Sequence, residues 1–174
     1  EDMQNLQADL EAREYDVSAG GGVVKIVVGG VFTANGTINA NGAGDGSYYG
    51  GAGGSVNVTA GSLTGAGTIM ADGQNPTFSN IGPAGGGRVA VKLTGAQSGF
   101  DDFTGEIHAY GGRPGNHGFG GAGTVFKKRG DQTMEQGALI VDNYGADRTV
   151  TKAGTYLGDR VTDCTSFGDI IVRG

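Results

Sequence analysis

Paired carboxylates are the first chemistry to look for, because enzymes that hydrolyse polysaccharides use two facing Asp or Glu side chains. The adjacent acids Asp101 and Asp102 are the obvious candidates. Neighbouring side chains of a strand point to opposite faces, and residues 99–103 have the composition of a turn. The sequence therefore predicts no catalytic pair, and we do not expect an enzyme. The alternative, a polysaccharide lyase or hydrolase, would need a groove where acids converge on Arg113 or Lys92.

Histidine, cysteine and metal-ligating residues add little catalytic chemistry. His108 alternates with a strand isoleucine and is expected to face outward, whereas His117 shares a Gly-Pro-rich loop with Arg113 and could line a cleft. Asp45, in a Gly-Asp-Gly segment, could contribute one carboxylate to a weak Ca²⁺ site. No other metal or cofactor is expected, because the sequence has no zinc-ligand cluster and no Gly-x-Ser-x-Gly motif. Cys164 is the single cysteine, so no internal disulfide can form.

Aromatic side chains are better candidates for binding a ligand. They recur in or beside three Gly-rich loops, residues 43–51, 74–85 and 113–120. Stacked repeats would bring some of these rings into a row that suits sugar rings or a partner chain. The alternative interpretation is that the rings only cover the loops. The predicted ligand-binding residues are Tyr48, Tyr49, Phe78, Tyr110, Arg113, His117 and Phe119.

Composition and charge set the class of protein that must position these residues. Glycine accounts for 38 of the 174 residues, and only 37% of the chain is hydrophobic. The net charge is −6, and residues 1–16 hold six acids and one arginine. Nucleic acid is not an expected partner, because the one basic cluster is residues 127–129. No apolar run is long enough for membrane insertion. Because the chain opens at Glu1 without a methionine, we expect a fragment of a longer protein.

Internal repeats organise most of the chain. Val24, Val56, Val89 and Val125 occupy equivalent positions at spacings of 32, 33 and 36 residues. A second set has spacings of 31, 38, 32 and 31 residues, and its members are Ile38, Ile69, Ile107, Leu139 and Ile170. Around each position apolar residues alternate with small or polar ones, which predicts short β-strands. Each unit is a strand, a Gly-containing turn, a second strand and a Gly-rich loop.

One such unit is too small to bury its own apolar face, so neighbouring units must stack and share a core. The sequence therefore predicts an all-β fold, a right-handed parallel β-helix (solenoid) of about four to five coils over residues 17–174, with each coil 31–38 residues long. A Gly-rich β-sandwich is the alternative fold. Residues 1–16 are expected to form a short amphipathic helix that caps the sheet edge.

Two resemblances to known families concern different parts of the chain. Residues 3–28, which include Met-Gln-Asn-Leu-Gln-Ala-Asp-Leu and Val-Val-Lys-Ile-Val-Val, resemble the opening of the small bacterial nucleoid-associated proteins called YbaB or EbfC. That family continues into a long helical segment, whereas this chain continues into Gly-rich repeats, so the likeness is interpreted as coincidental.

The second resemblance covers residues 20–174. Segments such as Gly-Gly-Ser-Val-Asn-Val, Leu-Thr-Gly-Ala-Gly-Thr-Ile and Phe-Thr-Gly-Glu-Ile-His-Ala-Tyr-Gly-Gly are similar to the Gly-rich parallel β-helix repeats of very large secreted or surface proteins of bacteria and some microbial eukaryotes. This resemblance implies an extracellular structural or adhesive role. It assigns no catalytic residue, because the shared motifs describe coil geometry.

The expected function is thus an extracellular or cell-surface structural or adhesive β-solenoid module that could self-associate into fibres or surface arrays. Its expected partners are copies of itself, neighbouring repeats of the same protein, or polysaccharide. A carbohydrate-binding or polysaccharide-cleaving β-helix domain is the alternative.

Overall fold

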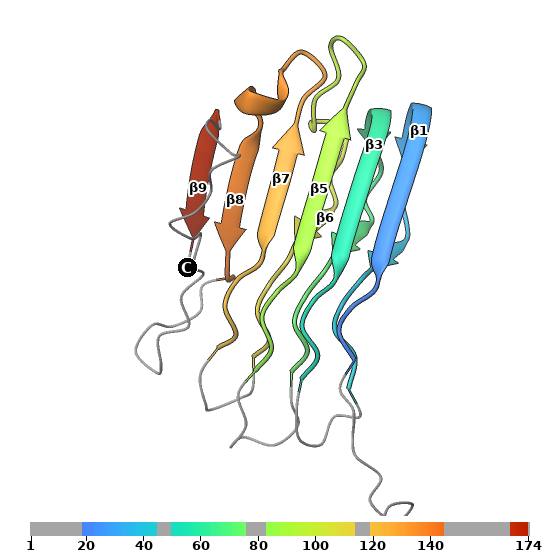
Figure 1. Ribbon diagram of the computed structural model, residues 1–174. Helices are drawn as coiled ribbons and strands as arrows, with labels where there is room; N and C mark the ends of the chain where they lie inside the picture. The colour runs from blue at the N-terminus through green and yellow to red at the C-terminus, as the bar shows by residue number, and fades with distance from the viewer. Residues whose placement is uncertain (1–18, 45–49, 76–82, 114–118, 145–167, 174) are drawn as a thin grey trace, which may run out of the picture.

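The computed structural model describes residues 19–44, 50–75, 83–113, 119–144 and 168–173 (Figure 1). The helix expected over residues 1–16 lies outside this part of the chain. The same is true of these candidate residues: Asp45, Tyr48, Tyr49, Phe78, His117 and Cys164.

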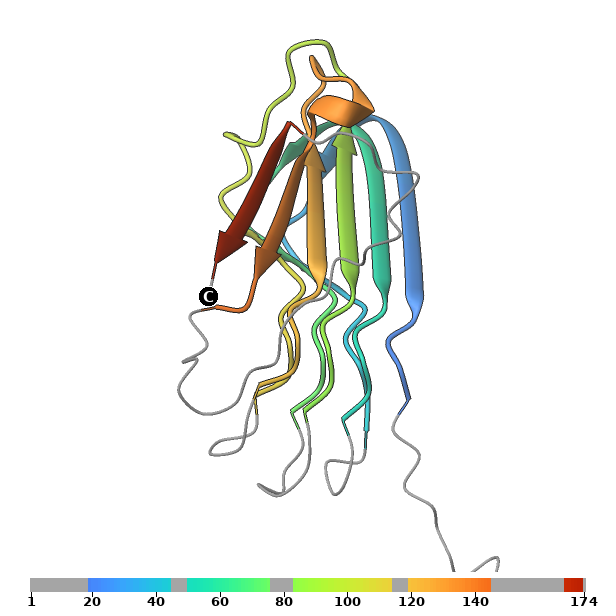
Figure 2. The same ribbon diagram turned by 60° about the vertical axis from the view of Figure 1, so that its left-hand side comes forward.

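The described strands form two sheets that lie face to face (Figures 1 and 2). The large sheet has the order β1 (Val23–Thr33), β3 (Ser55–Thr64), β5 (Arg88–Leu93), β7 (Thr124–Lys128), β8 (Ala138–Asp142) and β9 (Asp169–Arg173). The small sheet has the order β2 (Thr37–Asn39), β4 (Thr68–Met70) and β6 (Glu106–His108). A 3₁₀ helix, η1 (Met134–Gln136), lies between β7 and β8.

From β1 to β7 in the large sheet, and throughout the small sheet, neighbouring strands are parallel and in the register that the repeat spacing predicts. Val24, Val56, Val89 and Val125 are aligned across the large sheet. Ile38, Ile69 and Ile107 are aligned across the small sheet. The predicted parallel β-solenoid is therefore confirmed, with about three complete turns, and no sandwich is needed.

The fourth turn departs from the expected pattern. The repeat spacing predicts that Leu139 continues the isoleucine column of the small sheet, but β8 instead pairs antiparallel to β7 in the large sheet. Leu139 lies opposite Phe126 in this pairing, and β9 then pairs parallel to β8, with Leu139 opposite Ile170. The physical reason is that alternating apolar residues suit a parallel or an antiparallel neighbour equally well, so alternation does not fix strand direction. In the described residues the small sheet ends at β6.

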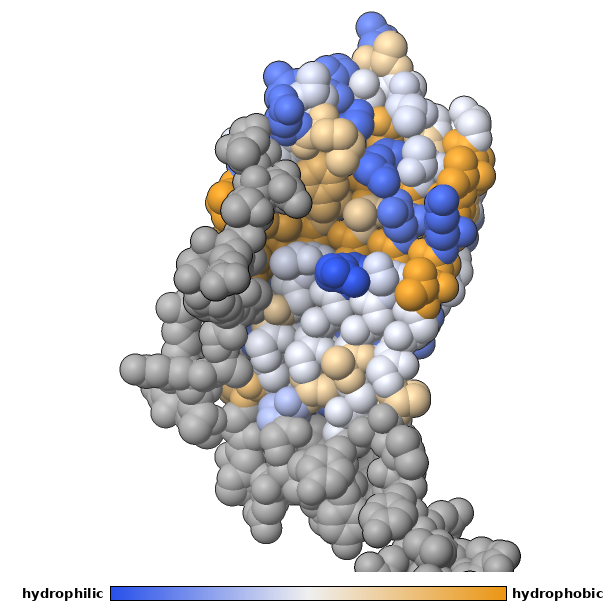
Figure 3. Space-filling view, in the orientation of Figure 1, coloured by the Kyte–Doolittle hydropathy of each residue, from blue (hydrophilic) through white to orange (hydrophobic). Residues whose placement is uncertain are grey.

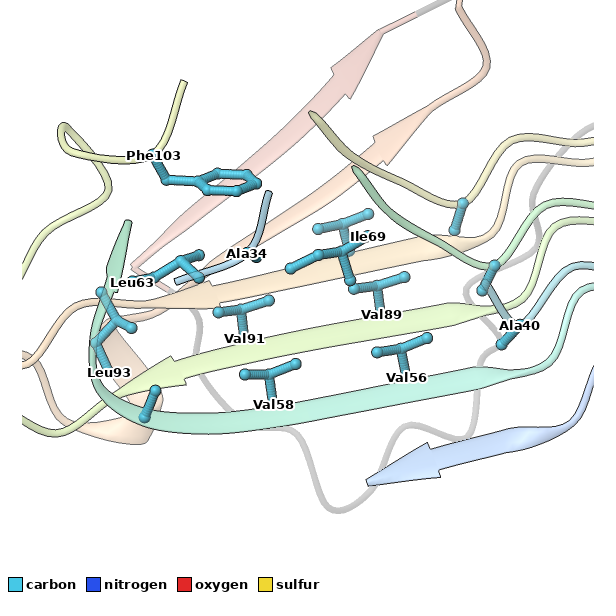
Figure 4. Packing of buried hydrophobic residues seen from close by; sticks show 14 residues of the cluster. Ala34, Ala40, Val56, Val58, Leu63, Ile69, Val89, Val91, Leu93 and Phe103 are labelled. Atoms are coloured by element: carbon cyan, nitrogen blue, oxygen red, sulfur yellow. The ribbon is translucent and has the colours of Figure 1, made fainter. Parts of the chain in front are cut away.

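The hydrophobic core lies between the two sheets (Figure 4). Val56 and Val58 of β3 and Val89 and Val91 of β5 are at most 1% exposed, and they face Ile69 of β4. Each fully buried side chain of this size stabilises the fold by about 1.5–3 kcal/mol. Leu63, Leu93 and Phe103 close the core at the corner where the chain passes from one sheet to the other.

At the end of the core that lies lower in Figure 2, the two layers come close enough for direct backbone contact. Here the amides of Gly54, Gly87 and Gly123 each donate a 2.7 Å hydrogen bond to an alanine carbonyl of the opposite layer. The acceptors are Ala40, Ala71 and Ala109. Glycine is required because a Cβ would overlap backbone atoms at many positions of this half. We call the part of the molecule that contains Gly54, Gly87 and Gly123 and their alanine acceptors the glycine half; the Gly-rich loops begin there.

Candidate functional site

One column of polar residues follows the small sheet at equivalent positions of successive turns. Asn41, Asp72 and Tyr110 each lie two residues beyond the last residue of β2, β4 and β6. The strand register fixes this alignment, because residues that follow paired positions in parallel strands also lie above one another. The turns therefore bring together side chains that are 31 and 38 residues apart in sequence.

The side-chain oxygens of Asn41 and Asp72 accept hydrogen bonds from the backbone of the next turn. Asn41 Oδ1 accepts from the Asp72 amide at 2.6 Å, and Asp72 Oδ1 accepts from the Tyr110 amide at 2.7 Å. Asn143, which follows β8, accepts from the Gly111 amide at 2.9 Å. Polar side chains thus provide acceptors for amides where the strands end.

His108 is held inside this column. Its Nδ1 atom lies 2.8 Å from Asp72 Oδ1 and its Nε2 atom 3.8 Å from Glu106 Oε2. With Asp72 as a carboxylate, which only accepts, His108 donates from Nδ1. The ring also stacks on Tyr110, with centroids 4.3 Å apart and planes within 8°. The expectation that His108 is a lone surface imidazole was wrong: the residue is 8% exposed, because it lies at the end of β6, where Asp72 of the previous turn covers it.

Arg113 and Tyr144 extend the column to the surface. The Arg113 guanidinium donates to the carbonyls of Asn143 and Tyr144, at 2.9 and 2.7 Å, and lies 4.4 Å from the centroid of the Tyr144 ring. The rings of Tyr144 and Tyr110 are 5.2 Å apart and tilted. Tyr144 has a backbone φ of 54°, a value that residues other than glycine rarely adopt. Its amide donates to Asp142 Oδ1 at 2.7 Å. We call Asp72, His108, Tyr110, Arg113, Asn143 and Tyr144 the Tyr110 cluster.

Negative charge surrounds Tyr110. Burial raises the pKa of its hydroxyl above the ordinary value, and the carboxylates of Asp142, Glu106 and Asp72 raise it further. The hydroxyl is therefore a neutral hydrogen-bond donor at physiological pH. Burial lowers the pKa of Lys127, and neighbouring Arg173 adds to this effect.

Two hollows flank Tyr110. One, of about 360 Å³, lies on the side of Asp72 and Arg113, and its lining also includes Gln74 and Asn75. The other, of about 170 Å³, is lined by Glu106, His108, Lys127, Asp142 and Arg173, together with apolar residues. Tyr110 borders both hollows. A polyhydroxylated ligand matches this combination of aromatic rings, carboxylates and a guanidinium, since each hydroxyl can both donate and accept.

The structure brings together two of the predicted ligand-binding residues, Tyr110 and Arg113. Phe119 is half-buried in the segment before β7 and lines neither hollow. Lys92 of β5 also lines neither of them. The other predicted ligand residues lie outside the described part of the chain.

Four members of the Tyr110 cluster were not predicted: Asp72, His108, Asn143 and Tyr144. The signal for Asp72 was present, because its spacings from Asn41 and Tyr110 equal those of the isoleucine column. Among the described residues there is no group of three or more His, Cys, Asp or Glu side chains that could hold a metal ion. The calcium hypothesis for Asp45 lies outside them.

Comparison with known proteins adds no name to this geometry. No protein-family model, no curated protein and no solved structure matches the chain. No helix in the described ranges is long and apolar enough to cross a membrane. The site and the fold are therefore the basis for any functional conclusion.

Proposed function

We propose that this chain is a structural or adhesive module of an extracellular or cell-surface protein. The observation that carries the proposal is the parallel pairing of β1, β3, β5 and β7, in which each turn is a template for the next and the β1–β3 register shifts only between Val28 and Val31. Continuous backbone pairing, together with backbone contact in the glycine half, favours a stiff element whose shape does not depend on a bound ligand. Such an element suits display or assembly.

The cluster side chains support the same proposal. Asp72, His108 and Asn143 each bind residues of another turn. These contacts brace the stack from the side. Buried polar groups with their partners in place rigidify a structure.

Sedimentation and negative-stain imaging of the purified chain over a range of concentrations, with and without calcium, test this role. Ordered fibres or large assemblies are the expected result. A monomer at every concentration in both conditions would contradict self-assembly.

Carbohydrate binding is the second candidate function, and the Tyr110 cluster favours it. Three carboxylates surround Tyr110, and Arg113 and Asp72 line the same hollow. A groove in which acids converge on Arg113 or Lys92 is the feature expected to distinguish a carbohydrate-binding or carbohydrate-cleaving domain. Here Asp72 shares the hollow of Arg113, and Glu106 and Asp142 line the other hollow beside Tyr110. Tyr144, 64% exposed, offers an aromatic face next to them.

Retardation in gels that contain a polysaccharide tests this second function. The wild-type chain is expected to be retarded by at least one acidic or neutral polysaccharide, and Tyr144→Ala to lose that retardation. Met134→Ala is the matched control, because Met134 is also exposed but belongs to η1, away from the cluster. Equal retardation of the three proteins would refute the assignment, and release of reducing ends would distinguish cleavage from binding.

A further inference from the structure

Glycines mark the places where one turn of the solenoid contacts the turn before it. At three such places the glycines form columns, and in the second and later turns a Cβ on the glycine would lie within 3 Å of a carbonyl oxygen of the preceding turn. Backbone fills the space in which a side chain would begin. The columns after the first turn are Gly54, Gly87 and Gly123; Gly61, Gly95 and Gly130; and Gly67 and Gly105.

The first turn also has glycine at these places, although no carbonyl of the described structure lies where a Cβ would be. Gly22, Gly29, Gly30 and Gly36 begin the three columns, and no atom of the described structure lies within 4 Å of a Cβ built on any of them. All four are exposed. A glycine without a steric reason destabilises a strand or its corner relative to alanine.

A fourth column shows that the sequence does not keep glycine at every equivalent position. A Cβ on Gly21, Gly53 or Gly86 would meet a carbonyl of the opposite layer, within 3 Å. The next member of this column is Ala122. Since glycine is not kept at every equivalent position, the open glycines of the first turn indicate a neighbour.

The apolar side chains of the first turn point to the same conclusion. Val24, Ile26 and Ile38 face the core but are only half-buried, whereas the equivalent residues of the second turn are at most 1% exposed. On the outer face of β1, Val23, Val27 and Val31 are 82%, 67% and 61% exposed. Figure 3 shows apolar side chains along the side of the molecule where β1 lies.

We propose that the outer edge of the first turn, formed by β1 and β2, binds a further turn of the same repeat carried by another polypeptide. The added turn pairs in parallel register, as β3 does with β1, so the turn-to-turn interface inside the molecule continues outward. Its carbonyl oxygens occupy the open space beside Gly22 and Gly36, and its inward valines complete the cover over Val24 and Ile26. This inference rests on the proposed structural role and names its partner.

Lys25 is the one charged residue of β1, so little charge opposes strand addition. A two-fold dimer of β1 with a second copy matches the observations less well. Antiparallel pairing would reverse the direction of the partner's strand, so the glycine columns would not continue from one copy to the next.

Binding of a labelled peptide tests the proposal. The peptide has the sequence of residues 53–73, which includes the two strands of the second turn and the corner between them, and its fluorescence anisotropy is measured at low micromolar concentration with the full chain. We expect saturable binding, and we expect Gly22→Ala combined with Gly36→Ala to weaken it by about tenfold or more, because each Cβ enters the space of a docked carbonyl. The variant itself has room for both methyl groups, so its unfolding midpoint is expected to stay at or above that of the wild type.

Met134→Ala is the control, because it changes an exposed residue of η1, outside the edge formed by β1 and β2, without adding atoms, and it is expected to bind the peptide normally. Three results would overturn the proposal: no binding to the wild-type chain, equal binding of a scrambled peptide, or equal binding to the double glycine variant. A dimer that forms equally well in that variant would also overturn it. If the peptide binds while the chain alone stays monomeric, the edge assignment stands and only self-assembly fails.

Discussion

Asp72→Ala should destabilise the fold much more than an ordinary surface substitution. Asp72 Oδ1 accepts hydrogen bonds from the Tyr110 amide, at 2.7 Å, and from His108 Nδ1, at 2.8 Å. The side chains of His108 and Asp72 are only 10% and 19% exposed, so water replaces the lost acceptor poorly. A buried donor left without a partner costs about 1–3 kcal/mol, so two such donors predict a loss of roughly 2–6 kcal/mol in the free energy of unfolding.

Urea unfolding followed by circular dichroism measures this loss. Asp72→Asn keeps an oxygen acceptor and loses only its charge, so it should lose about 1 kcal/mol. Asp131→Ala is the control, because Asp131 pairs with Arg129 on the surface and should change stability by less than about 1 kcal/mol. If Asp72→Ala loses no more than Asp72→Asn or Asp131→Ala, the column does not brace the turns and the reasoning fails.

Three further predictions concern the other parts of the structure. Tyr110 should ionise above its ordinary pKa of 10.0, as measured by subtracting the ultraviolet absorbance titration of Tyr110→Phe from that of the wild type. The stability that Tyr110 contributes should be complete below pH 10 and fall as pH rises through its higher folded-state pKa. Ionisation at or below pH 10 would contradict the argument from burial and charge. Ile69→Ala should reduce the free energy of unfolding by about 2–5 kcal/mol, whereas Val27→Ala, on the exposed face of β1, should change it by less than about 1 kcal/mol; similar losses in urea would refute the assignment of the core. Gly87→Ala should destabilise by about 1–3 kcal/mol, since its Cβ overlaps the backbone of the previous turn, and a thermal midpoint equal to that of the wild type would show that the turns can separate freely.

The repeat spacing predicted most of the fold because it reports on side-chain stacking. In a parallel solenoid, equivalent residues stack directly, so the recurrence of the Val56 and Ile69 positions along the chain is enough to indicate the register. The reversal at β8 could not be predicted in this way, since the period is the same for either strand direction. The direction depends instead on how the segment between β7 and β8, with η1, returns to the sheet.

The candidate site was predicted less completely, for a related reason. Tyr110 and Arg113 were selected by residue type near a loop, and type does not report contacts between turns. Asp72 and His108 become visible as partners only when the strand register is extended past the strand ends. Applying the repeat spacing to polar residues as well as to valines and isoleucines would have indicated the Asp72 position.

The glycine half also has a consequence for how stability depends on temperature. Burial of apolar surface gives unfolding a positive heat-capacity change, whereas burial of polar surface gives a negative one. The core between the sheets buries apolar surface, whereas the layers joined through Gly54, Gly87 and Gly123 bury mainly polar backbone surface. The two contributions partly cancel, which flattens the stability curve. Backbone bonding therefore persists on cooling while the hydrophobic contribution weakens, so this architecture is expected to lose less stability on cooling than a fold held by apolar burial alone.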